Sequence, residues 1–364
     1  MKVTRHTKIY EILRNRILAG AYGVDKKLPS EQELTKEFAV SRITVMRALN
    51  DLSHDGLIWR KQGAGSFVKS PDGEKCCLGL MIPGLGITTG ESVFTFVQNQ
   101  IIRNASQLGW QVLMGDLELP SQADASGRSP VEVARRLIAH GASAVAFVPF
   151  GITSRGVAYN HNVLAEFRSA KIPVVLMGGD LVDYPDRSDY DVIGLDDAHA
   201  GFLLGQHLLK SGCRNLAFVG MKTRLPAGAL RFGGVQKAVE RVPGSVCREL
   251  ILQRDGSDEK AIPAAVRKAK CDGIIGENDE VAVRAMRYLL DAGMKIGKKL
   301  KVGGFDDAPI AGLSPVPLTS VAQPAEEFAS EVISAIRDRL ISPALPGRWI
   351  RLHGRLVIRE STRG

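Results

Sequence analysis

Polar side chains that can donate and accept hydrogen bonds follow several apolar runs after residue 170 of this 364-residue chain. The set contains carboxylates, two amides and an arginine, namely Asp180, Arg231, Asn278, Asp279, Asp306 and Gln323. Ligands of parallel sheets bind beyond the carboxyl ends of the strands, so we expect these side chains to converge on one cleft. Paired donors and acceptors of this kind suit a polyhydroxylated ligand.

The same carboxylates could act as a general acid and base in an enzyme. No residue is marked as the proton donor, and the motifs G-x-S-x-G, G-x-x-x-x-G-K-[ST], H-E-x-x-H and G-x-G-x-x-G do not occur in the sequence. His199 and His207 are eight residues apart on one expected helix, too far for joint metal ligation. The five cysteines form no C-x-x-C pair, which favours reduced thiols. We therefore expect no catalytic residue, no metal and no cofactor.

A second set of polar groups lies in the stretch 41–52, which reads S-R-I-T-V-M-R-A-L-N-D-L. Ser41 is a suitable helix N-cap, and the apolar residues after it fall on one stripe, formed by Val45, Ala48, Leu49 and Leu52. The opposite face carries Arg42, Ile43, Thr44, Met46, Arg47 and Asn50. Cations and polar groups can bind phosphates and base edges, and Ile or Met can contact thymine methyl groups. The pattern predicts a helix that enters a DNA major groove.

Positive charge is concentrated in the same part of the chain. Residues 1–70 carry 13 Lys and Arg against 7 Asp and Glu, a surplus of six, whereas the whole chain has a net charge of +9. A polyanion is the simplest partner for such a segment, although solubility explains many basic surfaces equally well. The N-terminus is polar and no run of about 18 apolar residues occurs, so we expect a cytoplasmic protein that does not enter a membrane.

Local signals in residues 1–70 predict the elements that position this helix. A first helix is expected near 8–19, and Ser30 with Glu33 forms a capping box that starts a second one ending near Phe38. Only Ala39 and Val40 separate it from the helix at 41–52, as in a helix-turn-helix. Two β-prone runs around a glycine-rich tip at 62–66 then predict a hairpin.

This segment resembles the GntR family of bacterial regulators. The resemblance is carried by LPSEQEL at 28–34, SRITVMRAL at 41–49, DGLI at 55–58 and QGAGSFV at 62–68, all at that family's spacing. It implies a winged helix whose recognition helix lies in the major groove and whose wing reaches the minor groove. It places Glu31, Gln32, Arg42, Thr44, Gln62 and Gly63 near DNA. The helix at 41–52 itself adds Ser41, Ile43, Met46 and Arg47 to the expected contacts. Glu31 could equally stabilise the helix N-terminus, and Met46 stands where the family often has Arg.

Beyond a polar linker at 71–77, apolar runs alternate with amphipathic stretches to the end of the chain. Strands are expected at 78–83, 111–114, 144–148, 173–177, 192–195, 216–219, 273–276 and 301–304. Helices are expected at 93–108, 130–139, 161–170, 198–210, 231–240, 259–269, 280–292 and 325–341. The alternation predicts an α/β domain at 78–364 with mostly parallel sheets, and its length favours two lobes.

This second part resembles the LacI/GalR effector domain, which is similar to periplasmic sugar-binding proteins. The motifs are DDAHAG at 196–201, LRFGG at 230–234, ENDEVA at 277–282, VGGFDD at 302–307 and LTSVAQP at 318–324. The resemblance places ligand contacts at Phe94, Arg231, Asn278, Asp279, Asp306 and Gln323. Relatives usually have Asp after the fourth strand where this chain has Gly178, so Asp180 could take that role or the ligand could differ. Asp196 and Asp197 are expected to cap a helix and pack.

The combined reading is a ligand-responsive DNA-binding transcriptional regulator, expected to repress carbohydrate-utilisation genes. Its expected partners are double-stranded operator DNA, a small sugar-like effector and a second copy of the chain in a homodimer. The alternative is a cytosolic sugar-binding or sugar-processing protein whose basic N-terminal domain only mediates assembly.

Overall fold

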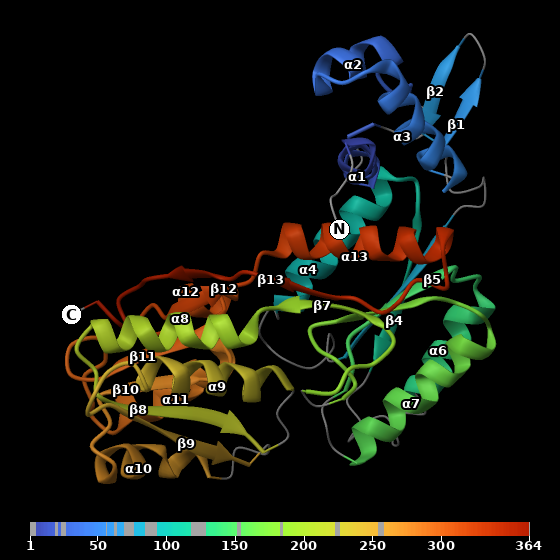
Figure 1. The fold of residues 1–364 in the computed structure, drawn as a ribbon. Helices are drawn as coiled ribbons and strands as arrows, with labels where there is room; N and C mark the ends of the chain where they lie inside the picture. The colour runs from blue at the N-terminus through green and yellow to red at the C-terminus, as the bar shows by residue number, and fades with distance from the viewer. Residues whose placement is uncertain are drawn as a thin grey trace.

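The computed structural model describes residues 5–18, 21–22, 27–55, 57–61, 64–68, 76–83, 93–117, 129–150, 154–182, 185–222, 226–253 and 258–363 (Figure 1). They form a small N-terminal domain at residues 5–68, which we call the reader, and a two-lobed α/β body. No helix among these residues is long and apolar enough to cross a membrane.

The reader is a winged helix. Its elements are α1 (Arg5–Leu18), α2 (Glu31–Phe38), α3 (Arg42–His54), β1 (Ile58–Lys61) and β2 (Gly65–Val68). The expected capping box is present, because the Ser30 hydroxyl accepts from the backbone N–H of Glu33 and the Glu33 carboxylate accepts from that of Ser30. β1 and β2 pair antiparallel as the wing. The predicted apolar stripe of α3 is buried against α1 in one hydrophobic cluster.

The N-terminal lobe of the body has a six-stranded parallel sheet of order β13-β7-β6-β5-β3-β4. Its strands are β3 (Cys77–Pro83), β4 (Gln111–Leu117), β5 (Ala144–Phe147), β6 (Val174–Met177), β7 (Asp191–Leu195) and β13 (Trp349–Leu352). Its helices are α4 (Val93–Gln107), α6 (Pro130–Ala139), α7 (Ser154–Ser169) and α13 (Ala325–Ile341). Two apolar clusters cover the sheet, one including α4 and α13 and the other α6 and α7.

The C-terminal lobe repeats this plan with a sheet of order β14-β12-β11-β10-β8-β9, in which only β14 runs antiparallel. Its strands are β8 (Asn215–Met221), β9 (Val246–Leu252), β10 (Gly273–Gly276), β11 (Lys301–Asp306), β12 (Thr319–Ala322) and β14 (Arg355–Val357). Its helices are α8 (Asp197–Lys210), α9 (Pro226–Val239), η1 (Glu259–Ala261), α10 (Ile262–Lys268), α11 (Asp279–Asp291) and α12 (Pro309–Leu313). The chain crosses between the lobes after β7, after β12 and after β13.

The structure confirms the alternating α/β pattern and differs from the expectation in several elements. Four strands, β9, β12, β13 and β14, were not predicted, and α7 begins seven residues earlier than expected. Cys76 and Cys77, at the end of the expected linker, were also expected to begin the first buried strand; Cys77 is the first residue of β3, and Cys76 before it is buried in the N-terminal lobe. Burial raises the pKa of the Cys76 thiol to about 11, which makes it a poor nucleophile at neutral pH.

Candidate DNA-binding face and ligand cavity

The outer face of α3 presents the side chains that the sequence assigned to DNA. Ile43 is 65% exposed and Met46 36% exposed, values that are high for apolar residues on a helix whose other face is buried. Arg42 and Arg47 are exposed beside them. Ser41 caps α3 by accepting from the Thr44 backbone N–H, and the two hydroxyl oxygens lie 2.9 Å apart.

Glu31, at the start of α2, organises the cations between α3 and the wing. Its Oε2 accepts a hydrogen bond from Arg42 Nε at 2.9 Å, and its Oε1 accepts one from Arg60 Nη2 at 2.6 Å. Arg60 Nη1 donates to Asn50 Oδ1 at 2.5 Å. Glu31 therefore orients the side chains of Arg42 and Arg60 through hydrogen bonds inside the protein. Arg60 was not assigned to the DNA-binding face from the sequence. The adjacent cations Arg60 and Lys61 on an expected wing strand could have indicated it, and both are exposed in the structure.

A groove of about 690 Å³ runs between the start of α2, α3 and the wing. Its lining includes Lys27, Glu31, Gln32, Arg42, Arg60 and Lys61, so four of these six side chains are cations. Gln32 is exposed at its edge. Gln62 and Gly63 lie outside the described residues. This basic groove beside an exposed helix face has the form of a surface for a polyanion.

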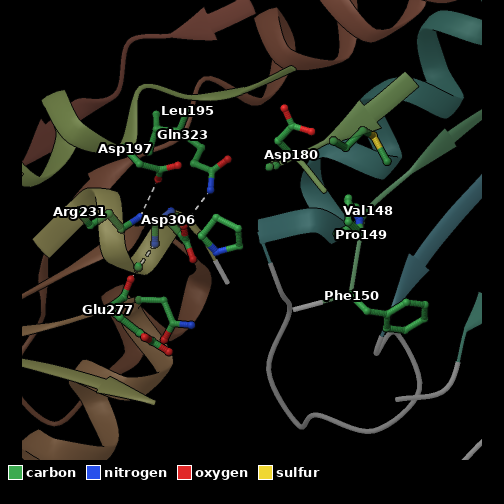
Figure 2. Close-up of a pocket in the computed structure, with 17 residues that line it drawn as sticks. Val148, Pro149, Phe150, Asp180, Leu195, Asp197, Arg231, Glu277, Asp306 and Gln323 are labelled. Atoms are coloured by element: carbon green, nitrogen blue, oxygen red, sulfur yellow. Dashed lines mark hydrogen bonds and ion pairs between the residues drawn. The ribbon is translucent and has the colours of Figure 1, made fainter. Parts of the chain in front are cut away.

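The ligand residues predicted from the sequence lie around a cavity of about 260 Å³ between the two lobes (Figure 2). Arg231, Glu277, Asp306 and Gln323 lie on one side and Asp180 with Val148, Pro149 and Phe150 on the other. The elements meet here because the strands of both sheets end with their carboxyl ends toward the cavity.

Arg231 is the central residue on the C-terminal-lobe side of the cavity. Its Nε donates to Asp197 Oδ1 at 2.8 Å, its Nη1 to the Glu277 carbonyl at 2.7 Å and its Nη2 to Asp306 Oδ1 at 3.3 Å. Its guanidinium also lies 4.8 Å from the ring centre of Phe305. These contacts hold a side chain that is only 6% exposed in a single orientation.

Burial and charge act against each other in this network. Burial alone would lower the pKa of Arg231, but the charges of Asp197 and Asp306 outweigh it and raise that pKa. Burial raises the pKa of Asp197 above its ordinary value, although Arg231 opposes the shift. The guanidinium therefore stays charged at every pH at which the chain is folded.

Asp306 links Arg231 to Gln323, whose Nε2 donates to Asp306 Oδ1 at 2.8 Å. The backbone of Asp306 has φ 103°, a conformation that non-glycine residues rarely adopt. Backbone strain of this kind costs about 1–3 kcal/mol and is often found at ligand sites. Here it holds the carboxylate between the guanidinium and the amide.

Asn278 and Asp279 have structural tasks at the start of α11. Asn278 lines the cavity, and its Oδ1 caps the helix by accepting from the Val281 N–H at 2.9 Å. Asp279 is 1% exposed and is not among the residues that line the cavity. It accepts from Ser320 Oγ at 2.6 Å and from the Ala308 N–H at 2.9 Å. Phe94 belongs to α4, but its side chain lies outside the described part of the chain.

The N-terminal-lobe side is built mainly from backbone and apolar side chains. Gly178 follows β6 with φ 81°, a conformation that suits glycine. Asp180 lines the cavity two residues later, and its two oxygens accept from the backbone N–H groups of Leu181 at 2.7 Å and Ser188 at 3.2 Å. Its own loop therefore fixes this carboxylate.

Two charged residues of the cavity were not assigned to it from the sequence. Asp196 caps α8 as expected, but Asp197 is buried against Arg231 and lines the cavity instead of only packing. Glu277 lines the cavity as well, and its Oε2 accepts from the Met221 N–H at 3.1 Å. Within the described residues, no group of three or more His, Cys, Asp and Glu could hold a metal.

Comparison with known proteins agrees with this architecture. Residues 5–68 match the family described as bacterial regulatory proteins, gntR family, and residues 206–362 match the periplasmic binding protein-like domain. The chain joins a GntR-type reader to a periplasmic-binding-protein-like body. Such a composition makes it a DNA-binding transcriptional regulator with a ligand-responsive body.

Its similarity to curated proteins extends over nearly the whole chain. An arabinose metabolism transcriptional repressor of Geobacillus stearothermophilus is 23% identical over 377 residues, covering 99% of this chain and 98% of that protein. A repressor of the same name from Halalkalibacterium halodurans is 26% identical over 381 residues, covering 99% and 96%. Both are named as regulators and not as enzymes. A LacI family regulator from Enterococcus faecium with bound ribose is 20% identical, covers 79% of this chain and 98% of its own, and has a TM-score of 0.62, which shows the shared fold.

Proposed function

We propose that this regulator is a repressor of carbohydrate-utilisation genes whose operator affinity changes when a sugar binds between its lobes. The single observation that carries the proposal is the polar network around Arg231, which faces Asp180 across one cavity. Carboxylates and amides on one side of the cavity, with the Asp180 carboxylate on the other, suit a ligand that carries several hydroxyl groups. The proposed contacts are Phe94, Asp180, Arg231, Asn278, Asp306 and Gln323, with Asp197 and Glu277 added. Asp279 is proposed to support Ser320 and the start of α12 from outside the cavity.

The size of the cavity favours a small sugar. Its volume of about 260 Å³ lies just below the range for small-molecule pockets, about 300–1,000 Å³. We therefore expect a monosaccharide or a derivative of similar size to bind better than a disaccharide. The relatives named as arabinose repressors and the ribose complex of a LacI family regulator support this choice.

On the DNA side, we propose that α3 lies in the major groove and the wing against the adjacent minor groove. The proposed contacts are Gln32, Ser41, Arg42, Ile43, Thr44, Met46, Arg47, Gln62 and Gly63, while Glu31 orients Arg42 and Arg60. Two such readers in a homodimer would bind a near-palindromic operator with half-sites at fixed spacing. Sugar binding and DNA binding would then be coupled reciprocally.

A thermal-shift screen with arabinose, ribose, other monosaccharides and cellobiose tests the ligand assignment. A ligand selective for the folded state raises the unfolding temperature. Asp180→Asn should reduce the sugar-induced shift because it weakens one side of the cavity, whereas Asp189→Asn, an exposed change on the same loop, should not. A shift that is equal in the wild type and in Asp180→Asn would contradict the proposed site.

A DNA titration tests the regulatory function. A selected operator should bind more tightly than random DNA, and the sugar identified in the screen should change only the specific affinity. Equal affinities for both DNAs at every salt concentration would contradict sequence-specific binding. Turnover of the sugar by the purified chain would instead favour the sugar-processing alternative.

A further inference from the structure

Two elements of the N-terminal lobe begin or end at the ligand cavity and continue away from it. Helix α13 starts at Ala325, two residues after Gln323, which binds Asp306. Strand β7 ends at Leu195, which lines the cavity, and is followed after one residue by Asp197, which binds Arg231. A helix of 17 residues spans about 25 Å, so α13 reaches well beyond the cavity.

The far ends of these two elements are tied together by ion pairs. Asp191, the first residue of β7, is fully buried and binds both Arg348 and Arg339, with N···O distances of 3.0 Å and 2.8 Å. Arg348 Nη1 also donates to Asp338 Oδ2 at 2.6 Å, and Asp338 lies in the last turn of α13. Burial disfavours the charge on Asp191, but the hydrogen bonds from Arg339 and Arg348 outweigh it and lower its pKa. The two elements therefore share one charged junction.

Helix α1 of the reader docks on this junction. Arg14 Nη2 donates to Asp338 Oδ1 at 2.7 Å, and Asp338 is only 4% exposed. Arg337 Nη1 donates to the carbonyl of Ile17 at 3.1 Å in a buried contact. Ile341, the last residue of α13, packs against the hydrophobic cluster of the reader. Figure 1 shows α1 lying over α13.

The reader end of this contact leads directly to the DNA-binding helix. Ile9, Leu13 and Ile17 of α1 belong to the same buried cluster as Val45 and Leu49 of α3. Because packed helices move as rigid bodies, a rotation of α1 must also rotate the exposed face of α3.

We infer that three contacts form a latch that couples the orientation of the reader to that of the N-terminal lobe. They join Arg14 to Asp338, Arg337 to the carbonyl of Ile17, and Ile341 to the hydrophobic cluster of the reader. Within the latch, Arg14 positions α1 of the reader against Asp338 of α13. The inference rests on the proposed function for its regulatory consequence: closure of the lobes around a sugar would shift α13 and β7 together, and the latch would pass that shift to α3. The 71–77 linker is then not the only connection through which the two domains communicate.

The latch can be tested in the whole 364-residue chain without any ligand. Incorporation of 5-fluorotryptophan places one reporter in the wing, Trp59, and two in the N-terminal lobe, Trp110 and Trp349. In Arg14→Gln, the ¹⁹F resonance of Trp59 should narrow because the reader tumbles more freely, while the other two lines stay unchanged. Lys8→Gln removes the same charge from an exposed position on α1 and should leave all three lines as in the wild type. An unchanged Trp59 line in Arg14→Gln overturns the latch.

A second measurement tests the regulatory consequence. Coupling between two sites commonly changes an affinity by about 5- to 150-fold. With arabinose as the probe, we expect Arg14→Gln to reduce its effect on operator affinity below about threefold, while Lys8→Gln changes the affinities with and without sugar by the same factor. Retention of the full sugar effect in Arg14→Gln overturns the coupling role but leaves the proposed function intact. Absence of a sugar effect in the wild type contradicts the proposed function for arabinose, and the Trp59 line still decides whether the latch exists.

Discussion

The molecule contains arginines paired with carboxylate and amide groups in two very different environments. At the cavity, Arg231 is buried with Asp197, Asp306 and Gln323. On the reader, the side chain of Arg42 is 71% exposed while it pairs with Glu31, which also binds Arg60 and through it Asn50.

The difference in burial decides what each network can do. Exposed ion pairs contribute little to stability because water and salt screen them, so Arg42 can exchange Glu31 for a phosphate or a base at small cost. A buried pair cannot lose one partner without leaving the other charge desolvated. Arg231 is therefore suited to keep a cavity in shape, and Arg42 to change partners.

Removal of Arg231 should have the largest effect. Arg231→Met leaves Asp197 and Asp306 near each other without their cation, and breaking a buried ion pair costs about 3–5 kcal/mol. The free energy of unfolding by urea measures this loss. Lys237→Met, which removes an exposed pair with Glu240, is the matched control and should leave stability nearly unchanged. A similar, small change in both variants would show that burial does not separate the two networks.

The stability of the protein should also depend on pH through Asp279, a buried carboxyl group beside this network. Burial is the largest cause that raises the pKa of Asp279, and the charge of Asp306 adds to it. Between the unfolded and the folded pKa values, Asp279 is protonated in the folded chain and ionised in the unfolded chain. Its contribution to the free energy of unfolding is therefore fully present below about pH 3.9 and is lost as the pH rises through the raised pKa. Asp279→Asn should flatten the decline of stability as pH rises from about 4, measured as urea midpoints across pH. The exposed change Asp189→Asn should keep the wild-type slope, and an equal slope in Asp279→Asn would refute the assignment.

Arg42→Gln should affect DNA binding and not stability. Loss of one phosphate contact should reduce the slope of log affinity against log salt by about 1 and weaken operator binding by about tenfold. Fluorescence anisotropy with a labelled operator at several salt concentrations measures both quantities. Arg241→Gln removes a cation from the C-terminal lobe and should leave the slope as it is. If Arg42→Gln behaves in the same way, its side chain stays with Glu31 in the complex.

The smallest effect is expected from Met46→Arg. Since Met46 is 36% exposed on the outer face of α3, its replacement should change the preferred base at one operator position, with only a modest change in affinity. Selection of binding sites from a random DNA pool measures the preference. Ile12→Arg adds the same charge to α1 and serves as the control. An unchanged preference in Met46→Arg would mean that this side chain does not contact bases.

Local patterns in the sequence predicted the elements that are continuous and strongly periodic. The capping box at Ser30 and the stripe of α3 are both present, because they depend on residues within two helical turns. The strands that were missed lack this signal. In β9, Arg248 and Glu249 stand side by side and interrupt the alternation of apolar and polar residues, and β13 and β14 are short and carry Arg at their solvent side.

The sequence by itself determined the order of the domains, most of their helices and strands, and the residue types that a sugar site and a DNA reader need. Only the tertiary structure decided which of these residues meet. Arg231 contacts Asp197 and Asp306, which are 34 and 75 residues away, and Arg14 contacts Asp338 across 324 residues. Periodicity and capping act over a few residues, whereas such contacts depend on how sheets and helices pack against each other. For the same reason, only the structure could distinguish Asp197, which belongs to the network of the cavity, from Asp196, which caps a helix.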